Sequence, residues 1–349
     1  MPTRTEPLLA AYASRPVLVT GGASFIGSHL VEELVRHGAR VRVADDLSSG
    51  RRESLQDVSA DCELMEGDLR EPDFAARAAA GRDVIFHLAA SHGGRGYIDT
   101  HPVECCNNML LDHVVLSSAA AAGASRVVFA SSACVYPVGL QTDPSARELL
   151  REDQCNFDEP GRTFPDGEYG WAKLMGELQL RAFHKQFGID AISCRLFTAY
   201  GERENESHAV VALVAKAIIG MDPFPVWGDG TQTRNFTYVG DTVHGMALAG
   251  VALEGFDTIN VGSPLHITIN ELVEEIFEAT GFRPAEIERQ VDKPVGVRAR
   301  AADCTKVGEG LGWYPRTTLE EGVHRTVDWY RGSATPERLA RLDELLMTR

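Results

Sequence analysis

Apolar and polar positions alternate along the first 130 residues with two different periods. Short apolar runs of strand length are separated by segments whose apolar residues recur at helical spacing. The predicted strands are Val17–Val19, Val41–Ala44, Cys62–Met65, Val84–Leu88 and Val127–Ala130, and the predicted helices are 25–37, 73–80 and 109–122. This alternation predicts an α/β fold, a doubly wound parallel sheet with helices on both faces.

The pattern is less regular in the second half. A loop at 137–167, rich in Pro, Gly, Asp and Glu, precedes a helix at 169–187 and a strand at Ala191–Leu196. Further helices are predicted at 209–219, 241–252, 269–280, 319–330 and 336–346. We expect a loose leader over 1–16 and a cofactor-binding domain over 16–190, to which parts of 220–250 return. A smaller α/β substrate lobe is expected over 191–349.

Bulk properties exclude several classes of function. A net charge of -16 argues against a nucleic-acid surface, which needs a basic stripe. No apolar run could span a bilayer, and the N-terminus lacks the apolar core of a secretory signal. Seven cysteines without paired spacing give neither a disulfide framework nor a metal site. We expect a cytoplasmic protein that binds neither membrane nor nucleic acid.

The stretch Val17–Leu30 carries the first chemical signal. Its strand leads through Gly21 into a helix, so backbone N–H groups and the positive helix end face one point, which suits a pyrophosphate. Ser24 stands where a central glycine is usual and adds a hydroxyl near the phosphates. The expected contacts are Gly21, Ser24, Phe25, Ile26 and Gly27. The alternative is an ordinary glycine turn before a helix.

The ends of the other predicted strands extend this signal. Asp45 follows the second strand, where a carboxylate can bind the ribose hydroxyls of NAD. Arg51 and Arg52 follow closely and leave NADP open as an alternative. Ligands of a parallel sheet bind at the carboxyl ends of its strands. The further expected cofactor contacts are therefore Asp68, Leu69 and Ala89.

Tyr169 and Lys173 lie four residues apart on a predicted helix and share a face. A lysine ammonium favours the phenolate form of a neighbouring tyrosine. The phenolate can then take a proton from a substrate hydroxyl while a hydride passes to NAD. Ser132, at the end of a predicted strand, can hydrogen-bond the same oxygen. A chance pair on an exposed helix face is the alternative.

Together these motifs identify a resemblance. TGGASFIG, GDLRE, HLAA, SSACVYP, YGWAK and GDGTQTRNFTYVGD are similar to segments of the extended short-chain dehydrogenase/reductase family of nucleotide-sugar epimerases and dehydratases, over about 16–330. The resemblance implies a Rossmann domain, a nucleotide-sugar lobe, tightly held NAD and catalysis by Ser132, Tyr169 and Lys173. It also implies a homodimer through helices near 109–122 and 169–187. Thr198 departs from the family, which commonly has asparagine there.

The subfamily signals point in two directions. Cys134 stands where dehydratases and decarboxylases carry acids, and it resembles a cysteine that serves as acid/base in GDP-mannose 3,5-epimerases. Gly93–Ile98 and Gly296–Arg300 resemble substrate segments of the same subfamily. By this resemblance His208 takes the place of a second acid/base lysine. Arg195–Gly201, in contrast, resembles UDP-glucuronate 4-epimerases.

The chemistry of a 3,5-epimerase agrees with these residues. Oxidation at C4 acidifies the neighbouring hydrogens, so an acid and a base on opposite faces can invert a carbon. Cys134 and His208 are the expected pair. A small packing residue remains the alternative for Cys134, and a surface or nucleotide-contacting histidine remains the alternative for His208.

The substrate is expected to be a nucleotide-diphosphate sugar. Arg234 and Arg300 can bind its phosphate oxygens bidentately, and Trp227 can frame the base or sugar unless it only packs the lobe. The full set of expected substrate contacts is Gly93, Gly94, Arg95, Ser132, Thr198, Trp227, Gln232, Arg234 and Arg300. Three functions remain open: a GDP-mannose 3,5-epimerase-like enzyme, a UDP-sugar 4-epimerase, and a non-catalytic dinucleotide sensor.

Overall fold

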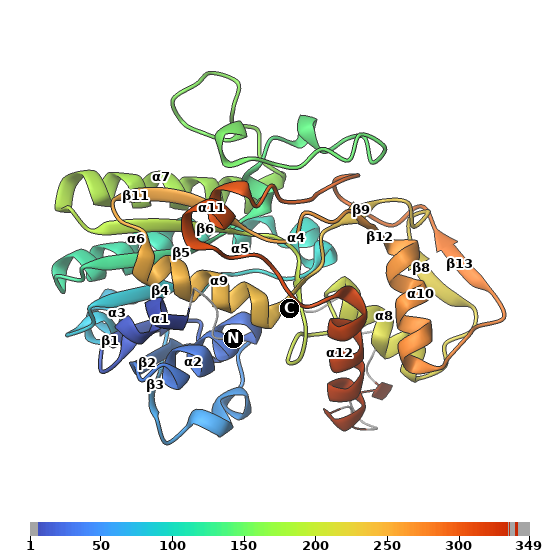
Figure 1. Ribbon diagram of the computed structural model, residues 1–349, viewed down its shortest axis with the longest axis horizontal. Helices are drawn as coiled ribbons and strands as arrows, with labels where there is room; N and C mark the ends of the chain where they lie inside the picture. The colour runs from blue at the N-terminus through green and yellow to red at the C-terminus, as the bar shows by residue number, and fades with distance from the viewer. Residues whose placement is uncertain (1–5, 334, 336–338, 341–349) are drawn as a thin grey trace.

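A parallel sheet forms the centre of the molecule, as the alternating pattern predicts. The computed structural model describes residues 6–333, 335, 339 and 340. Within them the sheet has seven strands in the order β11-β6-β5-β4-β1-β2-β3, and every neighbouring pair is parallel (Figure 1). The strands are β1 (Pro16–Thr20), β2 (Arg40–Asp45), β3 (Cys62–Glu66), β4 (Val84–His87), β5 (Arg126–Ser132), β6 (Asp190–Leu196) and β11 (Phe256–Val261).

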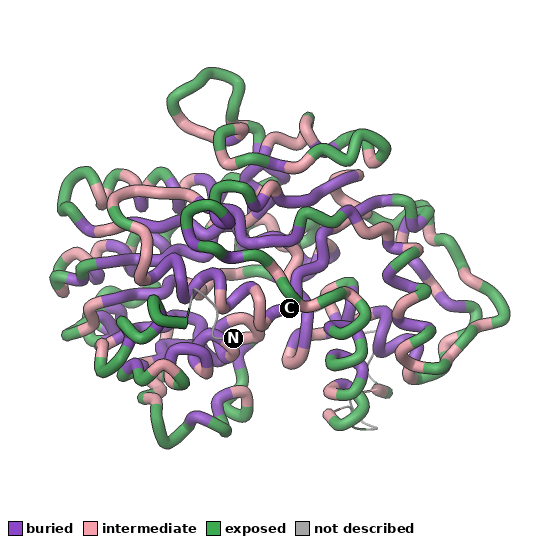
Figure 2. Tube along the Cα trace, viewed as in Figure 1, coloured by how far each residue is buried: buried purple, intermediate pink, exposed green. Residues whose placement is uncertain are grey.

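Helices cover both faces of this sheet. On one face α6 (Asn108–Ala121) packs against α3 (Pro72–Ala79) and α7 (Gly167–Phe187). On the other face α2 (Phe25–Arg36) packs against α9 (Val239–Ala252). Buried residues run along the sheet and the inner helix faces, and exposed residues gather in the outer loops (Figure 2). Helices on both faces are what a nearly continuous apolar strand sequence requires.

The carboxyl ends of the strands place many of the predicted site residues at one edge. Gly21 follows β1, Asp45 ends β2, and Ala89 lies just beyond β4. Ser132 ends β5, and Thr198 follows β6. The chain order reverses beside β1, whose neighbours are β2 and β4, and ligands of such sheets bind at this switch point.

The C-terminal half adds a smaller region at the other end of the molecule (Figure 1). Its helices α8 (Ala209–Ile218), α10 (Ile269–Thr280) and α12 (Leu319–Ser333) pack together. Three two-stranded pairs complete it. They are β7 (Ala199–Tyr200) with β10 (Thr237–Tyr238), β8 (Phe224–Trp227) with β13 (Ile287–Gln290), and β9 (Thr233–Arg234) with β12 (Ile267–Thr268).

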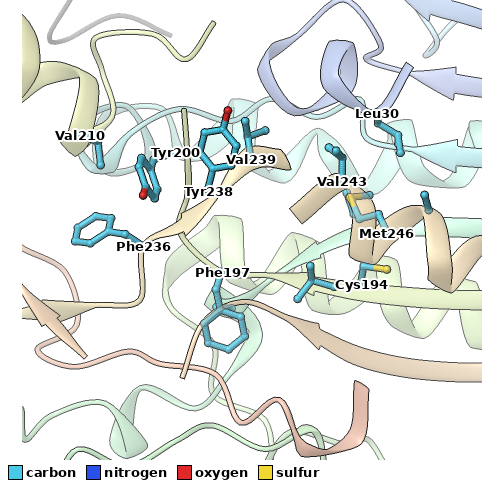
Figure 3. Close-up of a cluster of buried hydrophobic side chains, with 14 of the residues drawn as sticks. Leu30, Cys194, Phe197, Tyr200, Val210, Phe236, Tyr238, Val239, Val243 and Met246 are labelled. Carbon is cyan, nitrogen blue, oxygen red and sulfur yellow. The ribbon is translucent and has the colours of Figure 1, made fainter. Parts of the chain in front are cut away.

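One continuous core joins the two regions. Figure 3 shows Leu30, Cys194 and Met246 near the sheet, with Tyr200, Val210 and Phe236 farther into the smaller region. All six belong to a single cluster of buried side chains. Strand β6 and strand β11 lie in the central sheet although they follow residue 190. The predicted boundary at residue 190 therefore cuts through one packed structure. The assignment of cofactor binding to one region and substrate binding to the other remains a prediction.

The structure corrects the expected leader from residue 6 onward. Short helices α1 (Glu6–Leu9) and η1 (Ala10–Tyr12) precede β1. Leu9 and Tyr12 are buried, and the Tyr12 hydroxyl donates to the Ala247 carbonyl at 2.7 Å. This segment is too short for periodicity to reveal, but it packs against α9. Residues 1–5 lie outside the described part, as does most of the predicted helix 336–346.

Other elements were absent from the sequence prediction. Strand β11 was missed because its first half is only partly buried and carries polar residues. The short helices α4 (Arg95–Thr100), α5 (Pro102–Cys106) and α11 (Thr305–Leu311) were missed as well. The long loop, which ends where α7 begins at Gly167, contains the 3-10 turns η4 (Val138–Leu140) and η5 (Glu152–Gln154) after η3 (Ala133–Val135), and Leu150 forms an isolated bridge with Ala302.

Candidate active site

The glycine turn after β1 allows a close approach that other residues would prevent. Gly21 has a φ of +67°, and a Cβ there would lie 2.8 Å from the Ala89 nitrogen. A Cβ on Gly27 would lie 2.1 Å from the Gly21 carbonyl oxygen. The start of α2 can therefore lie directly on the turn. The Ser24 hydroxyl donates to the Gly21 carbonyl at 2.6 Å, so its proton is directed into the turn instead of toward a phosphate.

Asp45 stands at the end of β2 as expected. Its carboxylate accepts hydrogen bonds from the backbone N–H of Ala23 at 2.9 Å and of Leu47 at 2.8 Å. These contacts fix a carboxylate beside the glycine turn. The space above Gly21, the N-terminus of α2 and this carboxylate together fit a dinucleotide with a free ribose diol. The residues present thus fit NAD.

Tyr169, Lys173 and Ser132 are brought together by α7 and β5. Lys173 donates through Nζ to the Ala130 carbonyl at 2.8 Å and lies 6.0 Å from the centre of the Tyr169 ring. Burial raises the pKa of Tyr169, the Cys134 thiol adds to this, and a hydrogen bond with Ser132 opposes it. Burial lowers the pKa of Lys173. Burial is the largest of the influences on Tyr169 and favours the protonated phenol.

Cys134 lies in the turn after Ser132 and contacts a cation. Arg300 donates through Nη1 to the Cys134 sulfur at 3.2 Å and through Nη2 to Asp166 at 3.2 Å. Arg95 donates to the other oxygen of Asp166 at 3.0 Å. Although burial favours the neutral acid, Arg300 and Arg95 hold the pKa of Asp166 below its usual range. Arg300 therefore already contacts the thiol and a carboxylate. The diphosphate contact expected for it would have to share the guanidinium with these two groups.

Arg234 is placed differently from Arg300. It donates to the backbone carbonyls of Thr233 and Val295, both at 2.7 Å. Burial and, secondarily, the neighbouring Arg300 lower its pKa to about 9. A crowded cation held by neutral carbonyls favours an anionic ligand, so the expected phosphate contact remains a prediction for this residue.

His208 belongs to a second cluster, which reaches Tyr169 through His92. Its ring stacks on His92 with centroids 5.1 Å apart, and the His92 ring lies 5.8 Å from that of Tyr169. His208 Nδ1 lies 3.1 Å from the Asn205 side-chain oxygen, so in this tautomer Nε2 is the ring acceptor. Burial lowers the pKa of His208 to about 4. It also raises the pKa of nearby Glu204 well above its usual range. His208 is therefore neutral near pH 7.

These groups line one cavity of about 1160 Å³ between the sheet and the smaller region. The predicted residues that line it are Gly21, Ser24, Phe25, Ile26, Asp45, Asp68, Leu69, Ala89, Gly93, Gly94, Arg95, Ser132, Cys134, Tyr169, Lys173, Thr198, His208, Arg234 and Arg300. Gly27, Trp227 and Gln232 are not among the lining residues. Gly27 lies beneath the turn, and Gln232 donates to the Trp227 carbonyl at 3.0 Å.

Sequence reasoning missed several polar residues of this cavity, three of which contact predicted site residues. Asp166 joins Arg95 to Arg300, His92 stacks on His208, and Glu204 lies 3.8 Å from His208. In the sequence, these residues could have been noticed only by their position next to the motifs. His92 precedes the Gly93–Ile98 stretch, and Glu204 follows the Arg195–Gly201 stretch. Among the described residues, no group of three or more His, Cys, Asp or Glu side chains could hold a metal ion.

Comparisons with known proteins agree with this site. A family model described as the NAD dependent epimerase/dehydratase family matches residues 17–262. The chain belongs to this family. The residues beyond the match carry Arg300, so the family model by itself does not cover the whole cavity.

Curated relatives cover almost the whole chain. GDP-mannose 3,5-epimerase 1 of Oryza sativa subsp. japonica is 31% identical over 333 residues, which are 94% of this chain and 84% of that protein. UDP-glucose 4-epimerase of Mycolicibacterium smegmatis is 31% identical and covers 91% of this chain and 99% of that protein. The solved structure of MoeE5, in complex with UDP-glucuronic acid and NAD, is 31% identical with a TM-score of 0.78, covering 91% of this chain and all (100%) of that one.

The chain is therefore an NAD-dependent enzyme of the epimerase/dehydratase family, and NAD is its cofactor. The doubly wound fold is confirmed as well. Among the helices of the described residues, none combines the length and the apolar character needed to cross a membrane. The cytoplasmic location remains a prediction.

Proposed function

We propose that this chain is a nucleotide-sugar epimerase of the GDP-mannose 3,5-epimerase type, which inverts carbons beside a transient 4-keto group. The supporting observation is the Cys134 thiol, which lines the cavity beside Ser132 and accepts a hydrogen bond from Arg300. An epimerase that acts only at C4 needs no second proton-transfer group. Here the Cys134 thiol and the neutral His208 lie in the same cavity as Tyr169, so the site has two proton-transfer groups besides the tyrosine.

Each residue of the site is assigned to a particular carbon or group of the substrate. The glycine turn and Asp45 would hold NAD, which would supply hydride acceptance and return at C4. The positive nicotinamide ring would favour the phenolate of Tyr169, which would take the proton of the C4 hydroxyl and later return it, while Ser132 holds that oxygen. Lys173 is fixed beneath them by the Ala130 carbonyl. Cys134 and His208 exchange protons at the carbons next to C4, and Arg234 binds the diphosphate.

A UDP-sugar 4-epimerase is the second candidate. The Arg195–Gly201 stretch resembles UDP-glucuronate 4-epimerases, and relatives of equal identity are a UDP-glucose 4-epimerase and a protein bound to UDP-glucuronic acid. In that case Cys134 and His208 only shape the cavity. A third candidate, the idle dinucleotide sensor, is disfavoured because Ser132, Tyr169 and Lys173 are all assembled at the cavity.

Proton exchange with solvent separates these candidates. The enzyme is incubated in deuterated water with GDP-mannose and, separately, with UDP-glucuronate, and the sugars are examined by mass spectrometry and proton NMR. We expect deuterium at C3 or C5 with GDP-mannose. Epimerised product without deuterium would establish the 4-epimerase. Bound NAD with neither sugar converted would contradict both epimerase candidates for these substrates, reopen the choice of substrate and support the sensor.

Variants assign the exchange to individual residues. Cys134→Ala should slow deuterium incorporation by roughly 100-fold, because general acid–base groups contribute about that factor or more. Cys62→Ala, on strand β3 and away from the cavity, is the matched control. Tyr169→Phe should abolish turnover while NAD remains bound. Full exchange in Cys134→Ala would contradict the proposed role of the thiol.

We also infer that two copies pair through α6 and α7. Both helices expose large apolar side chains, which are Met109 and Leu110 on α6 and Trp171, Leu178 and Phe187 on α7. The two helices lie side by side on one face of the sheet (Figure 1). Apolar side chains gathered over two adjacent helices favour association with a second such surface.

A further inference from the structure

Arg203 connects the two halves of the molecule across the cavity. It lies in the loop 201–208 that leads into α8, and its φ of 68° is in a region that side chains rarely adopt. Its Nη1 donates to Glu32 of α2 at 2.6 Å, and its Nη2 donates to the other Glu32 oxygen at 2.9 Å. Nη1 also donates to the Ser54 carbonyl at 2.8 Å, in the 3-10 helix η2 (Arg52–Val58). One guanidinium thus joins this loop to two N-terminal elements.

Two glutamates of the loop attach it to the C-terminal half. Glu202 accepts from the Tyr238 hydroxyl at 2.8 Å, and Glu206 accepts from the Tyr330 hydroxyl at 2.9 Å. The end of the loop also meets the N-terminal half, because the Ser207 carbonyl lies so close to Gly94 that a Cβ on that glycine would be 1.8 Å away. Substituting Arg203 therefore leaves the loop anchored to the C-terminal half while it removes these bonds to α2 and η2.

The bridge also lies in the wall of the cofactor cavity. Glu32, Ser54 and Arg203 line the same cavity as Phe25 and Asp45, which are expected to contact NAD. We propose that the Arg203–Glu32 bridge closes this wall and retains NAD between catalytic cycles. The proposal rests on NAD as the cofactor, and it is independent of which sugar the enzyme converts.

The strength of the bridge comes from its geometry and partial burial. Bidentate pairing of a guanidinium with a carboxylate is stronger and more directional than a single ionic contact. The two side chains are only 20% and 24% exposed, so water screens the pair incompletely. Opening the wall breaks three hydrogen bonds, two of them to a charged partner. The backbone strain at Arg203 persists because these contacts hold it.

The rate of NAD release tests the proposal without any sugar present. Purified enzyme loaded with labelled NAD is mixed with excess unlabelled NAD, and the label that remains bound is followed by gel filtration. Arg203→Ala and Glu32→Gln should each release NAD about tenfold faster, because hydrogen bonds to charged groups are worth about that factor. The charge exchange E32R/R203E should recover part of the loss. Arg283→Ala, which removes exposed ion pairs far from the cavity, should release NAD at the wild-type rate.

A second measurement uses the unaltered enzyme. Raising the salt concentration from about 0.05 M to about 1 M screens partly exposed charges, so wild-type enzyme should release NAD faster and Arg203→Ala should change little. Release rates within twofold of wild type in both single variants would overturn the proposal. So would a wild-type rate that does not respond to salt. A changed release rate with an unchanged melting temperature would exclude a purely structural role.

Discussion

Single residues show what spacing can predict and what it cannot. The interval between Tyr169 and Lys173 correctly placed both on one face of a helix beside Ser132. The protonation of the pair could not be read from that interval. Burial acts on both groups in the direction of the neutral form, so the pKa of Tyr169 rises and that of Lys173 falls.

Two partly buried histidines of the cavity wall predict how stability depends on pH. Burial, with Arg203 as a second cause, lowers the pKa of His29 to about 4, and burial lowers that of His208 to about 4. Unfolded histidine titrates near pH 6.5, so between about pH 6.5 and 4 the unfolded chain binds protons that the folded chain does not. Stability should therefore fall as the pH decreases through this window.

Urea unfolding at pH 7 and at pH 5, with NAD saturating, measures this effect. His29→Gln should lose less stability between the two pH values than wild type, because it lacks one of the two groups. His324→Gln, at an exposed position on α12, should behave like wild type. An equal loss in His29→Gln and wild type would refute the assignment to His29.

At the scale of elements, a buried ion pair holds α7 against the sheet. Glu177 of α7 accepts from Arg195 of β6 at 2.9 Å and from the hydroxyl of Ser131 in β5 at 2.5 Å. Arg195 also donates to the carbonyls of Glu152 and Cys155 in the long loop. These contacts fix the helix that carries Tyr169 to the strand that carries Ser132. The sequence predicted the helix and both strands but gave no sign of the pair.

The contact between α2 and the glycine turn predicts the result of one substitution. Gly27→Ala places a methyl group 2.1 Å from the Gly21 carbonyl oxygen, so helix and turn must separate. We expect a loss of roughly 1–3 kcal/mol in unfolding free energy, as for other overpacked sites, together with weaker NAD binding. Calorimetric titration with NAD and urea unfolding measure the two effects.

Gly310→Ala is the control for this substitution. Gly310 lies in α11 with no atom within 4 Å of the added methyl group. Alanine there should leave NAD binding unchanged and should not lower stability, because alanine favours helix. Wild-type NAD affinity in Gly27→Ala would show that the close approach is not required.

At the scale of the whole molecule, the cavity depends on segments from both halves. The loops at 91–95 and 201–208 are far apart in sequence, yet Gly94 lies against Ser207 and His92 stacks on His208. The strand pattern predicted the edge where Gly21 and Asp45 lie. It could not predict which loop of the smaller region meets that edge.

The proposed dimer gives a prediction at the same scale. Leu110→Glu puts a charge into the apolar surface of α6 and α7, at a side chain that is 55% exposed in the single chain. We expect the dimer dissociation constant to rise about 30-fold or more, since disrupting a central apolar contact costs about 2 kcal/mol. Sedimentation velocity measures the distribution of species. Leu265→Glu, equally exposed but away from these helices, is the control, and a wild-type protein that sediments as a monomer at about 10 µM would contradict the inference.

The sequence by itself determined most strands and helices of the central sheet, the glycine turn and the spacing of Tyr169 and Lys173 on α7. Each of these is a local pattern, because strand burial, turn conformation and helix periodicity depend on neighbouring residues. Tertiary structure alone decided that Arg300 contacts Cys134, that His92 pairs with His208 and that Arg203 reaches Glu32. These contacts join residues far apart in the chain, and only packing around one sheet and one core brings them together.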